Sequence, residues 1–586
     1  MEALLDNNAG SVALRKGSFY SRFAELVSRP RAAYGIAALA VVLSLPALSI
    51  GLTADDFDLG MEVQRDPLSA YAFHSRDPVL GKAAILEARA AGKAPWWIDP
   101  EQHVAFLRPL SSLSLALDFS LFPSAPWLMH LENSILFALI VLLAASLYKA
   151  LGLSERTRGI ATFFFAMQGA QSMTIGWIAG RNTLLAALFG LLAMRLFVAA
   201  HSSKRMPLAA LAAFVLALLS GEGGVAAGAY MCSYALFAGP VSVKRMLSAI
   251  WPFAVVVLIW LIAYKTLGYG AKNSGFYVDA SQTPLLWLVD LITAVPIYLA
   301  SQLTFPFAST ASLHPLARPI VTVISLAILF VSRSLWLPWL ERDSRARTFG
   351  LGALLAILPL GSSIPQDRLV TFIALGICGL LALIVEERLS KPCELPERGA
   401  TRLFRYHAIW APVLFVPMLF GASQPMVAGG GASVLDKVLG SDVRPVLLVN
   451  APGYLPVHFY ARKRQWFDKP YAPIEVMYAG AAELELTRSA EQSLELAVHG
   501  GYFGSRVERI ERDPRVHPLQ VGDVIQTNRM RAEVIEVKDA VPTRVRFDFE
   551  ESLNDARVYA WYGHDLEPLA LPQVGQRVQI RGAGAL

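Results

Sequence analysis

Long apolar stretches separated by short polar loops occupy most of the first 420 residues. A helix needs roughly 20 apolar residues to span a bilayer, and the first such runs cover residues 33–52 and 127–150. Further apolar runs lie at residues 159–178, 183–200, 207–219, 223–238, 247–264, 285–303, 319–338, 348–362, 369–385 and 407–421. The pattern predicts a polytopic α-helical membrane domain over residues 33–424, with about 11 to 12 helical segments.

One of these runs does not fit a simple span. Pro296 and Pro306 interrupt residues 285–308, and counting this run as a full crossing places the basic residues 342–347 outside. Irregular backbone at membrane depth must be covered by protein or face water. We therefore expect residues 285–308 to be re-entrant or to lie along the membrane interface.

The pattern changes near residue 425. Gly429, Gly430 and Gly431 predict a flexible linker over residues 425–443. Short runs with β-strand composition then follow, such as residues 445–449, 533–537 and 544–549, separated by Gly, Pro and Asp. This spacing favours a β-rich soluble domain over residues 444–586, built as a sandwich or a barrel.

Composition and charge set the orientation. Apolar residues make up 54% of the chain and charged residues only 17%, which is typical of a membrane protein. Residues 425–586 carry 19 Lys and Arg against 21 Asp and Glu, so the basic surplus belongs to the apolar part. We interpret it as loop charge on the cytoplasmic side and not as a nucleic-acid surface. This orientation gives a cytoplasmic tail at 1–32, an external loop at 53–126 and an external C-terminal domain.

The first chemical signal is an acidic cluster just beyond the first span. Asp55, Asp56 and Asp58 follow its external end. Carboxylates close to hydrocarbon are costly and are often functional. The alternative is that they cap the start of an external helix, where Asp is common.

Other polar motifs fall on the same side of the membrane in this topology. They are Arg108-Pro109-Leu110, His130 to Asn133, Trp177 to Arg181, Leu218 to Glu222, and Asp367-Arg368. A histidine such as His130 could also be interfacial or satisfied by a neighbouring helix. The convergence of motifs far apart in sequence predicts a single external site.

These motifs, in this order, resemble those of the C-type (GT-C) membrane glycosyltransferases. The resemblance is to bacterial homologues of the transmembrane O-mannosyltransferases with tetratricopeptide repeats, and it covers roughly residues 33–390. Two features depart from that family. Gly221 stands where the family has Lys, and the C-terminal part shows a β-rich pattern instead of the repeats.

The resemblance implies an inverting sugar transfer from a polyprenyl-phosphate donor, at the external face of a bacterial inner membrane. It implies Asp55 as the base and Asp56 as its partner in orienting the acceptor. Arg108, Arg181 and Arg368 are expected to bind the donor phosphate, since Arg binds phosphate oxygens bidentately. His130, Asn133 and Glu222 are secondary candidates. The C-terminal domain, without a recognisable catalytic motif, is expected to bind, orient or pack.

Several alternatives stay open at this point. No cofactor is expected, although a divalent metal could use the Asp pair as oxygen ligands. The acceptor could be a glycan, a lipid or a protein, and membrane lipids surround the apolar part. A lipid-linked-sugar flippase or transporter would also carry external charges and broken helices. A third hypothesis is a non-catalytic membrane scaffold.

Overall fold

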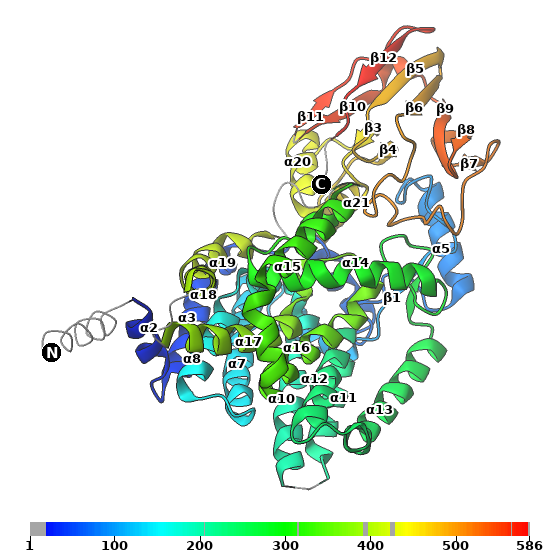
Figure 1. Ribbon diagram of the computed structural model, residues 1–586. Coiled ribbons are helices and arrows are strands. Elements are labelled where there is room, and N and C mark those ends of the chain that lie inside the picture. Colours follow the sequence, from blue (N-terminus) through cyan, green and yellow to red (C-terminus); the bar gives the residue numbers. More distant parts are fainter. Residues whose placement is uncertain are drawn as a thin grey trace, which may run out of the picture.

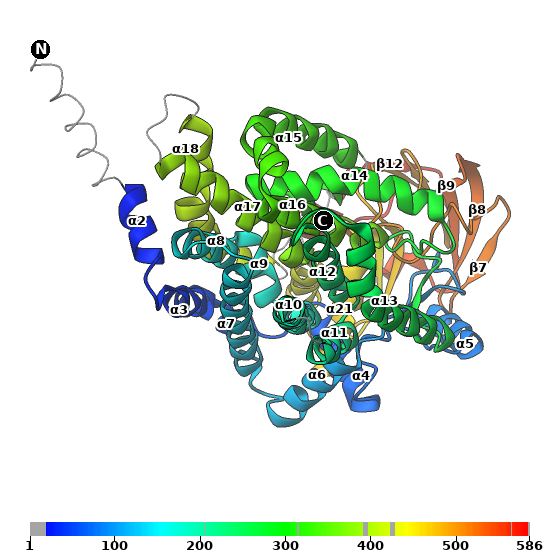
Figure 2. The ribbon, with the colours of Figure 1, turned by 60° about the horizontal axis from the view of Figure 1, so that its bottom comes forward.

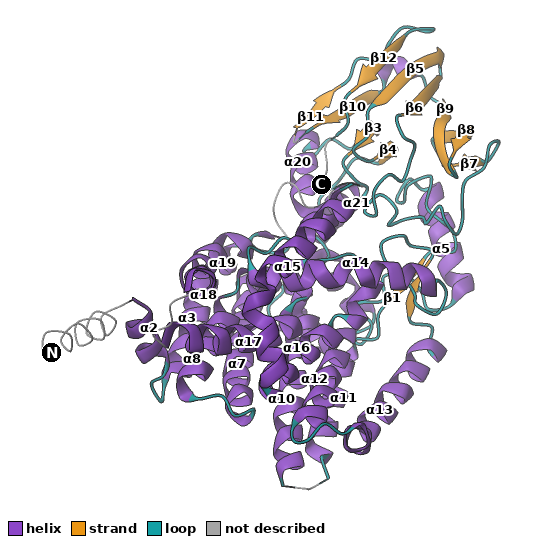
Figure 3. Ribbon diagram, viewed as in Figure 1, coloured by secondary structure: helices purple, strands orange, loops and turns teal. Residues whose placement is uncertain are grey.

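The fold is described from a computed structural model, which covers residues 19–203, 206–312, 314, 316–390, 397–421, 428–563 and 565–583. Helices form the larger part of the molecule, and most of the strands gather at one end of it, as Figure 3 shows. The predicted class, a polytopic helical membrane protein with a β-rich C-terminal domain, is confirmed.

The membrane part consists of helices of unequal length (Figure 1). Its first half contains α2 (Phe19–Val27), α3 (Ala32–Ser44), η1 (Leu45–Ser49), α7 (Pro126–Ala150), α8 (Glu155–Met167), α9 (Gly169–Ile175), η2 (Ile178–Gly180) and α10 (Arg181–Ser202). Its second half contains α11 (Leu208–Ser220), η3 (Glu222–Val225), α12 (Ala226–Phe237), α13 (Val243–Thr266), α14 (Pro284–Leu303), η4 (Ala308–Ser312), α15 (Ala317–Arg342), α16 (Ser344–Ala356), η5 (Leu358–Ser362), η6 (Asp367–Leu369), α17 (Thr371–Ser390), α18 (Glu397–Arg405), η7 (Tyr406–Trp410) and α19 (Ala411–Leu419).

Six helices in the described part of the chain are long and apolar enough to cross a membrane. They are Ala32–Ser49, Pro126–Ala150, Ile178–Ser202, Val243–Thr266, Pro284–Leu303 and Ala317–Arg342. Several other predicted spans are shorter helices. The predicted span 159–178, for example, is divided into α8 and α9 because Gln168 adopts an extended conformation between them. Its side-chain amide donates to Gln302 Oε1 at 2.6 Å, so this break is stabilised by a buried polar contact.

The segment 285–308 differs in detail from the prediction. Pro296 does not interrupt it, because α14 continues through this proline as one helix from Pro284 to Leu303. In Figure 1, α7, α10 and α12 run from top to bottom, whereas α14 runs across them, and it keeps this direction in Figure 2. Such a course suits the expected interfacial position. The membrane position of α14 stays a prediction.

The first external loop is an ordered layer. It contains α4 (Asp56–Arg65), α5 (Pro78–Ala90), β1 (His103–Ala105) and α6 (Pro109–Leu121). Strand β1 pairs antiparallel with β2 (Gly270–Lys272), which belongs to the loop after α13. Two loops from distant parts of the chain are therefore joined beneath the C-terminal domain.

The C-terminal domain contains two sheets and two helices. The first sheet has the order β11-β10-β3-β4, and the second has the order β12-β5-β6-β9-β8-β7. Their bounds are β3 (Val446–Ala451), β4 (Ile474–Ala479), β5 (Leu484–Ala490), β6 (Ser493–Val498), β7 (Val524–Gln526), β8 (Met530–Lys538), β9 (Val541–Phe549), β10 (Arg557–Tyr562), β11 (Asp565–Pro568) and β12 (Arg577–Ile580), with η9 at Leu553–Asp555. The second sheet is antiparallel throughout, and buried positions alternate along β5 and β6, as expected for a half-covered sheet.

Two expectations for this region were wrong. The first sheet is mixed, because β3 pairs parallel with β4 and with β10, and α21 (Leu455–Trp466) connects β3 to β4. A crossover helix between parallel strands is not part of a simple sandwich or barrel. The predicted flexible linker 425–443 also contains a helix, α20 (Ala428–Leu439), which includes the three glycines.

The C-terminal domain is built onto the first external loop. Trp96 and Trp97 of that loop belong to the domain's apolar core, and Trp96 Nε1 donates to Met477 O at 3.1 Å. Asp99 lies 2.6 Å from His517 Nδ1. The domain is therefore a fixed part of the structure above the helices, and this position brings it to the candidate site.

Candidate active site

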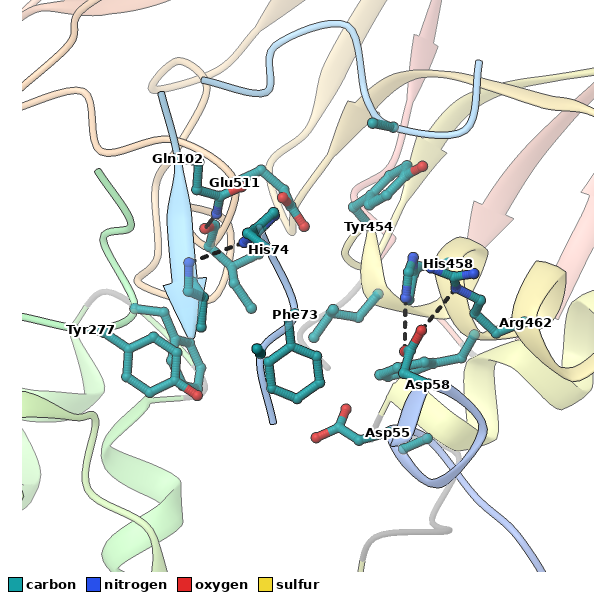
Figure 4. A pocket seen from close by; sticks show the side chains of 18 of the residues that line it. Asp55, Asp58, Phe73, His74, Gln102, Tyr277, Tyr454, His458, Arg462 and Glu511 are labelled. Carbon is teal, nitrogen blue, oxygen red and sulfur yellow. Dashed lines mark hydrogen bonds and ion pairs between the residues drawn. The ribbon is translucent and has the colours of Figure 1, made fainter. Parts of the chain in front are cut away.

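A cavity of about 920 Å³ lies where the helices, the first external loop and the C-terminal domain meet. Met173, Trp177 and Arg368 line it from the helical part. Tyr454 and His458 line it from the C-terminal domain. Figure 4 shows its polar side chains facing one another across Phe73. A cavity of this size lies in the range that binds drug-sized organic molecules.

Asp55 faces this cavity. It stands at the N-cap position of α4, but its side chain makes no capping hydrogen bond. The preceding residue, Ala54, has a φ of 49°, an uncommon conformation for a residue with a Cβ atom. Burial and the neighbouring Asp58 raise the pKa of Asp55 to about 6, while Arg368, His458 and Arg108 oppose this rise. A carboxyl group with this pKa can accept a proton near neutral pH.

Asp56 does not line the cavity. It is completely buried, where one carboxylate oxygen accepts from Thr53 N at 2.9 Å and the other accepts from Ala179 N at 2.7 Å. Burial raises the pKa of this carboxyl to about 8. Asp56 therefore ties the start of α4 to the turn before α10. Thr53 N lies before α4 and Ala179 N lies in η2, so Asp56 does not cap the first turn of α4, and Asp55 makes no capping hydrogen bond either.

Arg368 also faces the cavity. Its Nε donates to Gln366 Oε1, and its guanidinium carbon lies 4.5 Å from the centre of the Trp177 ring. Within the residues that the structure describes, no carboxylate forms an ion pair with it. Arg368 is therefore a cation that can bind an anionic ligand in the cavity.

The other two predicted arginines form ion pairs with carboxylates. Arg108 Nε donates to Glu222 Oε2 at 2.7 Å, and its guanidinium lies over the rings of Tyr71 and Phe106. It is not among the residues that line the cavity, although its charge acts on Asp55. Of the three arginines expected to bind the donor phosphate, only Arg368 lines this cavity.

Arg181 lies at the centre of a buried polar network. It is completely buried, 2.9 Å from Asp118 Oδ2 and 3.0 Å from Glu132 Oε2, and its Nε donates to Asn133. Asn133 Nδ2 in turn donates to Ile175 O and Trp177 O. His130 Nε2 lies 3.0 Å from Gly51 O, near the end of the first span. These residues join helix ends to one another beneath the cavity.

The C-terminal domain contributes His458 and Arg462 to the cavity, and no sequence motif predicted them. His458 Nε2 lies 2.9 Å from Asp58 Oδ2, and Arg462 Nε lies 2.8 Å from Asp58 Oδ1. Burial opposes the ionisation of Asp58 and of His458, but the two charges stabilise each other, so the pKa of Asp58 is lowered and that of His458 is raised. The available signal was the spacing of His458 and Arg462, which places them on one face of a helix.

The divalent metal that the sequence left open has no ligand cluster among the described residues. Among the described residues, no group of three or more His, Cys, Asp or Glu side chains is placed to hold a metal ion. At the cavity, Asp58 instead forms an ion pair with Arg462.

Comparisons with known proteins give a distant likeness. No family model matches the chain, and no curated protein matches it. Two solved structures are similar: ArnT from Cupriavidus metallidurans bound to undecaprenyl phosphate (11% identity, TM-score 0.38) and the same protein in the apo state (13%, 0.35). Each match covers 74% of this chain and 84% of ArnT. Both TM-scores lie below 0.5, so the function proposed below rests on the residues of this chain.

Proposed function

We propose that this chain is a membrane glycosyltransferase that moves a sugar from a polyprenyl-phosphate donor to an acceptor hydroxyl group. The observation that supports this most is that Asp55 and Arg368 line the same cavity. Asp55 is a carboxylate without a capping bond, and Arg368 is a cation without an ion pair among the described residues. A base and an anion-binding group are the two functions that such a transfer requires.

The reaction follows from these two roles. The acceptor oxygen attacks the anomeric carbon of the sugar while Asp55 takes the acceptor proton. The bond from the anomeric carbon to the phosphate oxygen breaks, and polyprenyl phosphate leaves with the bonding electrons. Arg368 stabilises the negative charge of this phosphate. Attack opposite to the leaving group inverts the anomeric configuration.

Asp56 and Arg181 act through position in this scheme. The hydrogen bonds of Asp56 fix the residue that precedes α4, and so they fix Asp55. Arg181 and Asn133 hold the turn that carries Trp177, on which Arg368 lies. The orienting role expected of Asp56 is therefore proposed as an indirect one.

The orientation is proposed from the Lys and Arg asymmetry of the loops. The N-terminus and the loop 386–405 face the cytoplasm, and the cavity and the C-terminal domain face outward, across a bacterial inner membrane. A reporter fused after residue 583 should behave as external. A cytoplasmic reporter signal would place the cavity on the side of nucleotide sugars and remove the reason for a lipid-linked donor.

The function itself is tested with purified protein and a polyprenyl-phosphate sugar. We expect release of polyprenyl phosphate, and Asp55→Asn should lower its rate by roughly 10²-fold or more, since Asn cannot accept the proton. Asp66→Asn is the matched control, because Asp66 also lines the cavity but lies at the exposed end of α4. Near-normal turnover by Asp55→Asn with unchanged thermal stability would remove Asp55 as the base. A flippase would move the lipid without this release.

A further inference from the structure

A second polar group lies in the cavity, apart from Asp55 and Arg368. It consists of His74, Gln102 and Glu511. His74 and Gln102 come from the first external loop, whereas Glu511 comes from the long connection between β6 and β7 in the C-terminal domain. Figure 4 shows these three side chains on one side of Phe73, with Asp55 and Asp58 on the other.

Gln102 carries a polar atom without a partner. Its side chain is only 4% exposed, and its Nε2 donates to Ile510 O. Its Oε1 has no hydrogen-bond partner among the residues that the structure describes. A buried oxygen without a donor costs free energy. Because Gln102 lines the cavity, a ligand hydroxyl can supply the missing donor.

His74 and Glu511 supply the complementary hydrogen-bonding groups. His74 Nδ1 accepts from Val104 N at 3.0 Å, which leaves Nε2 as the ring atom that carries a hydrogen. Burial lowers the pKa of His74 to about 4, so the ring is neutral near pH 7. Burial raises the pKa of Glu511 to about 7, although His458 and the Gln102 side chain oppose this rise. Near pH 7 its carboxyl group is therefore about half protonated, and it can donate in the protonated form and accept in both forms. The group thus presents an acceptor, a donor and a side chain that does both.

An apolar surface stands beside these polar atoms. Phe73 lines the cavity, and its side chain remains 37% exposed. Tyr277 and Tyr454 also line the cavity, and Tyr454 OH donates to Lys93 O at 2.9 Å. An exposed aromatic ring beside fixed polar groups is typical of a small-molecule site.

We propose that His74, Gln102, Glu511 and Phe73 form a binding site for a sugar ring with free hydroxyl groups, the sugar of the acceptor. Each hydroxyl group of a sugar donates and accepts, so one ring can satisfy all three polar side chains. The C–H face of the ring packs on Phe73. The inference rests on the proposed function, because it places the acceptor on the side of Asp55 that faces the C-terminal domain.

Binding is measured without any donor, so that it is independent of turnover. The purified full chain is titrated with methyl glycosides of neutral hexoses and N-acetylhexosamines, and bound sugar is detected by saturation-transfer NMR. At least one glycoside should bind saturably. Glu511→Ala and Gln102→Leu should weaken its binding by about tenfold, the effect of one or two lost hydrogen bonds. Glu511→Gln keeps a donor and an acceptor, so its binding should stay within about threefold of the wild type.

Two controls make the result specific. Gln579→Leu makes the same chemical change on β12, where Gln579 is exposed and bonded to Glu485, and it should bind the glycoside like the wild type. Thermal unfolding of Gln102→Leu shows whether loss of the hydrogen bond to Ile510 has unfolded the site. If it has, the binding result of Glu511→Ala decides the test, because this variant leaves that hydrogen bond in place.

Three outcomes would overturn the site. The first is no saturable binding by any glycoside. The second is wild-type binding by each of Glu511→Ala and Gln102→Leu that remains folded. The third is equal binding of N-acetylserinamide with the same sensitivity to the variants. The last outcome would indicate a peptide acceptor. A chain that binds glycosides but never releases polyprenyl phosphate would retain the sugar site and lose the transferase proposal. Turnover without glycoside binding would remove the sugar site and leave the transferase proposal in place.

Discussion

Replacing Arg368 by Gln should move the pH dependence of turnover in a defined direction. If Asp55 is the base, only its deprotonated form is active, so the rate falls as the pH drops through about 6. Arg368 is the strongest of the groups that lower this pKa. Removing its charge should therefore shift the acidic limb to higher pH.

The size of this shift follows from the charges involved. An opposite charge close to a carboxylate changes its pKa by roughly one unit or more. A move of about one unit, from near 6 to near 7, lowers the deprotonated fraction at pH 6 from about a half to about a tenth. Arg368→Gln should thus lose about fivefold more activity at pH 6 than at pH 8.5. At pH 8.5 Asp55 is almost fully deprotonated in both proteins, so any loss of activity there reports the missing contact between Arg368 and the phosphate.

The assay is the release of polyprenyl phosphate at saturating donor between pH 5 and 9. Arg65→Gln is the control, since Arg65 also lines the cavity but is mostly exposed and paired with Glu62 at 2.8 Å. The midpoint of the acidic limb in Arg65→Gln should equal that of the wild type. An unchanged midpoint in Arg368→Gln, or a wild type without an acidic limb near pH 6, would refute Asp55 as the base.

Three further predictions concern the supporting residues. Asp56→Asn should lower stability by about 1–3 kcal/mol and reduce activity in parallel, because the amide cannot accept from both Thr53 N and Ala179 N; thermal unfolding in detergent measures this, and unchanged stability would contradict it. Arg181→Met should cost about 3–5 kcal/mol, since it leaves Asp118 and Glu132 without their cation, and the yield of folded protein reports it. The raised pKa of His458 means that its ion pair with Asp58 is present below that pKa and is lost as the pH rises through it. Amide hydrogen exchange in α21 should therefore rise with pH more steeply than the intrinsic exchange rate of an unprotected amide. The variant His458→Gln should not show this additional rise.

The apolar pattern predicted the fold class because membrane insertion is decided locally, by length and hydropathy. It could not predict the break at Gln168, which depends on a contact with Gln302, more than a hundred residues away. Gly429 to Gly431 predicted a linker from glycine's conformational freedom. In the structure they lie within α20, which packs against α21, so tertiary contact overrides local preference.

Local sequence signals also indicated part of the candidate site. Asp55 and Arg368 stand at the ends of apolar runs, where an unpaired charge is conspicuous in sequence. Arg108 and Arg181 looked alike from the sequence, because nothing local distinguishes a cation that faces a cavity from one that a carboxylate neutralises. Their partners Glu222 and Asp118 are brought to them by other helices.

The position of the C-terminal domain bears on the scaffold hypothesis. A domain that the membrane part merely displays would have a complete core of its own and a replaceable contact with the helices. Here Trp96 and Trp97 of the first external loop complete the domain's core, and they follow α5 in the same loop that carries Asp55. The domain in return supplies His458 and Arg462, whose charges neutralise Asp58 beside Asp55. Without them, Asp58 would be a buried, unpaired carboxylate next to the proposed base, at a cost of several kcal/mol. The loop and the domain therefore depend on each other for stability, and the environment of Asp55 depends on both.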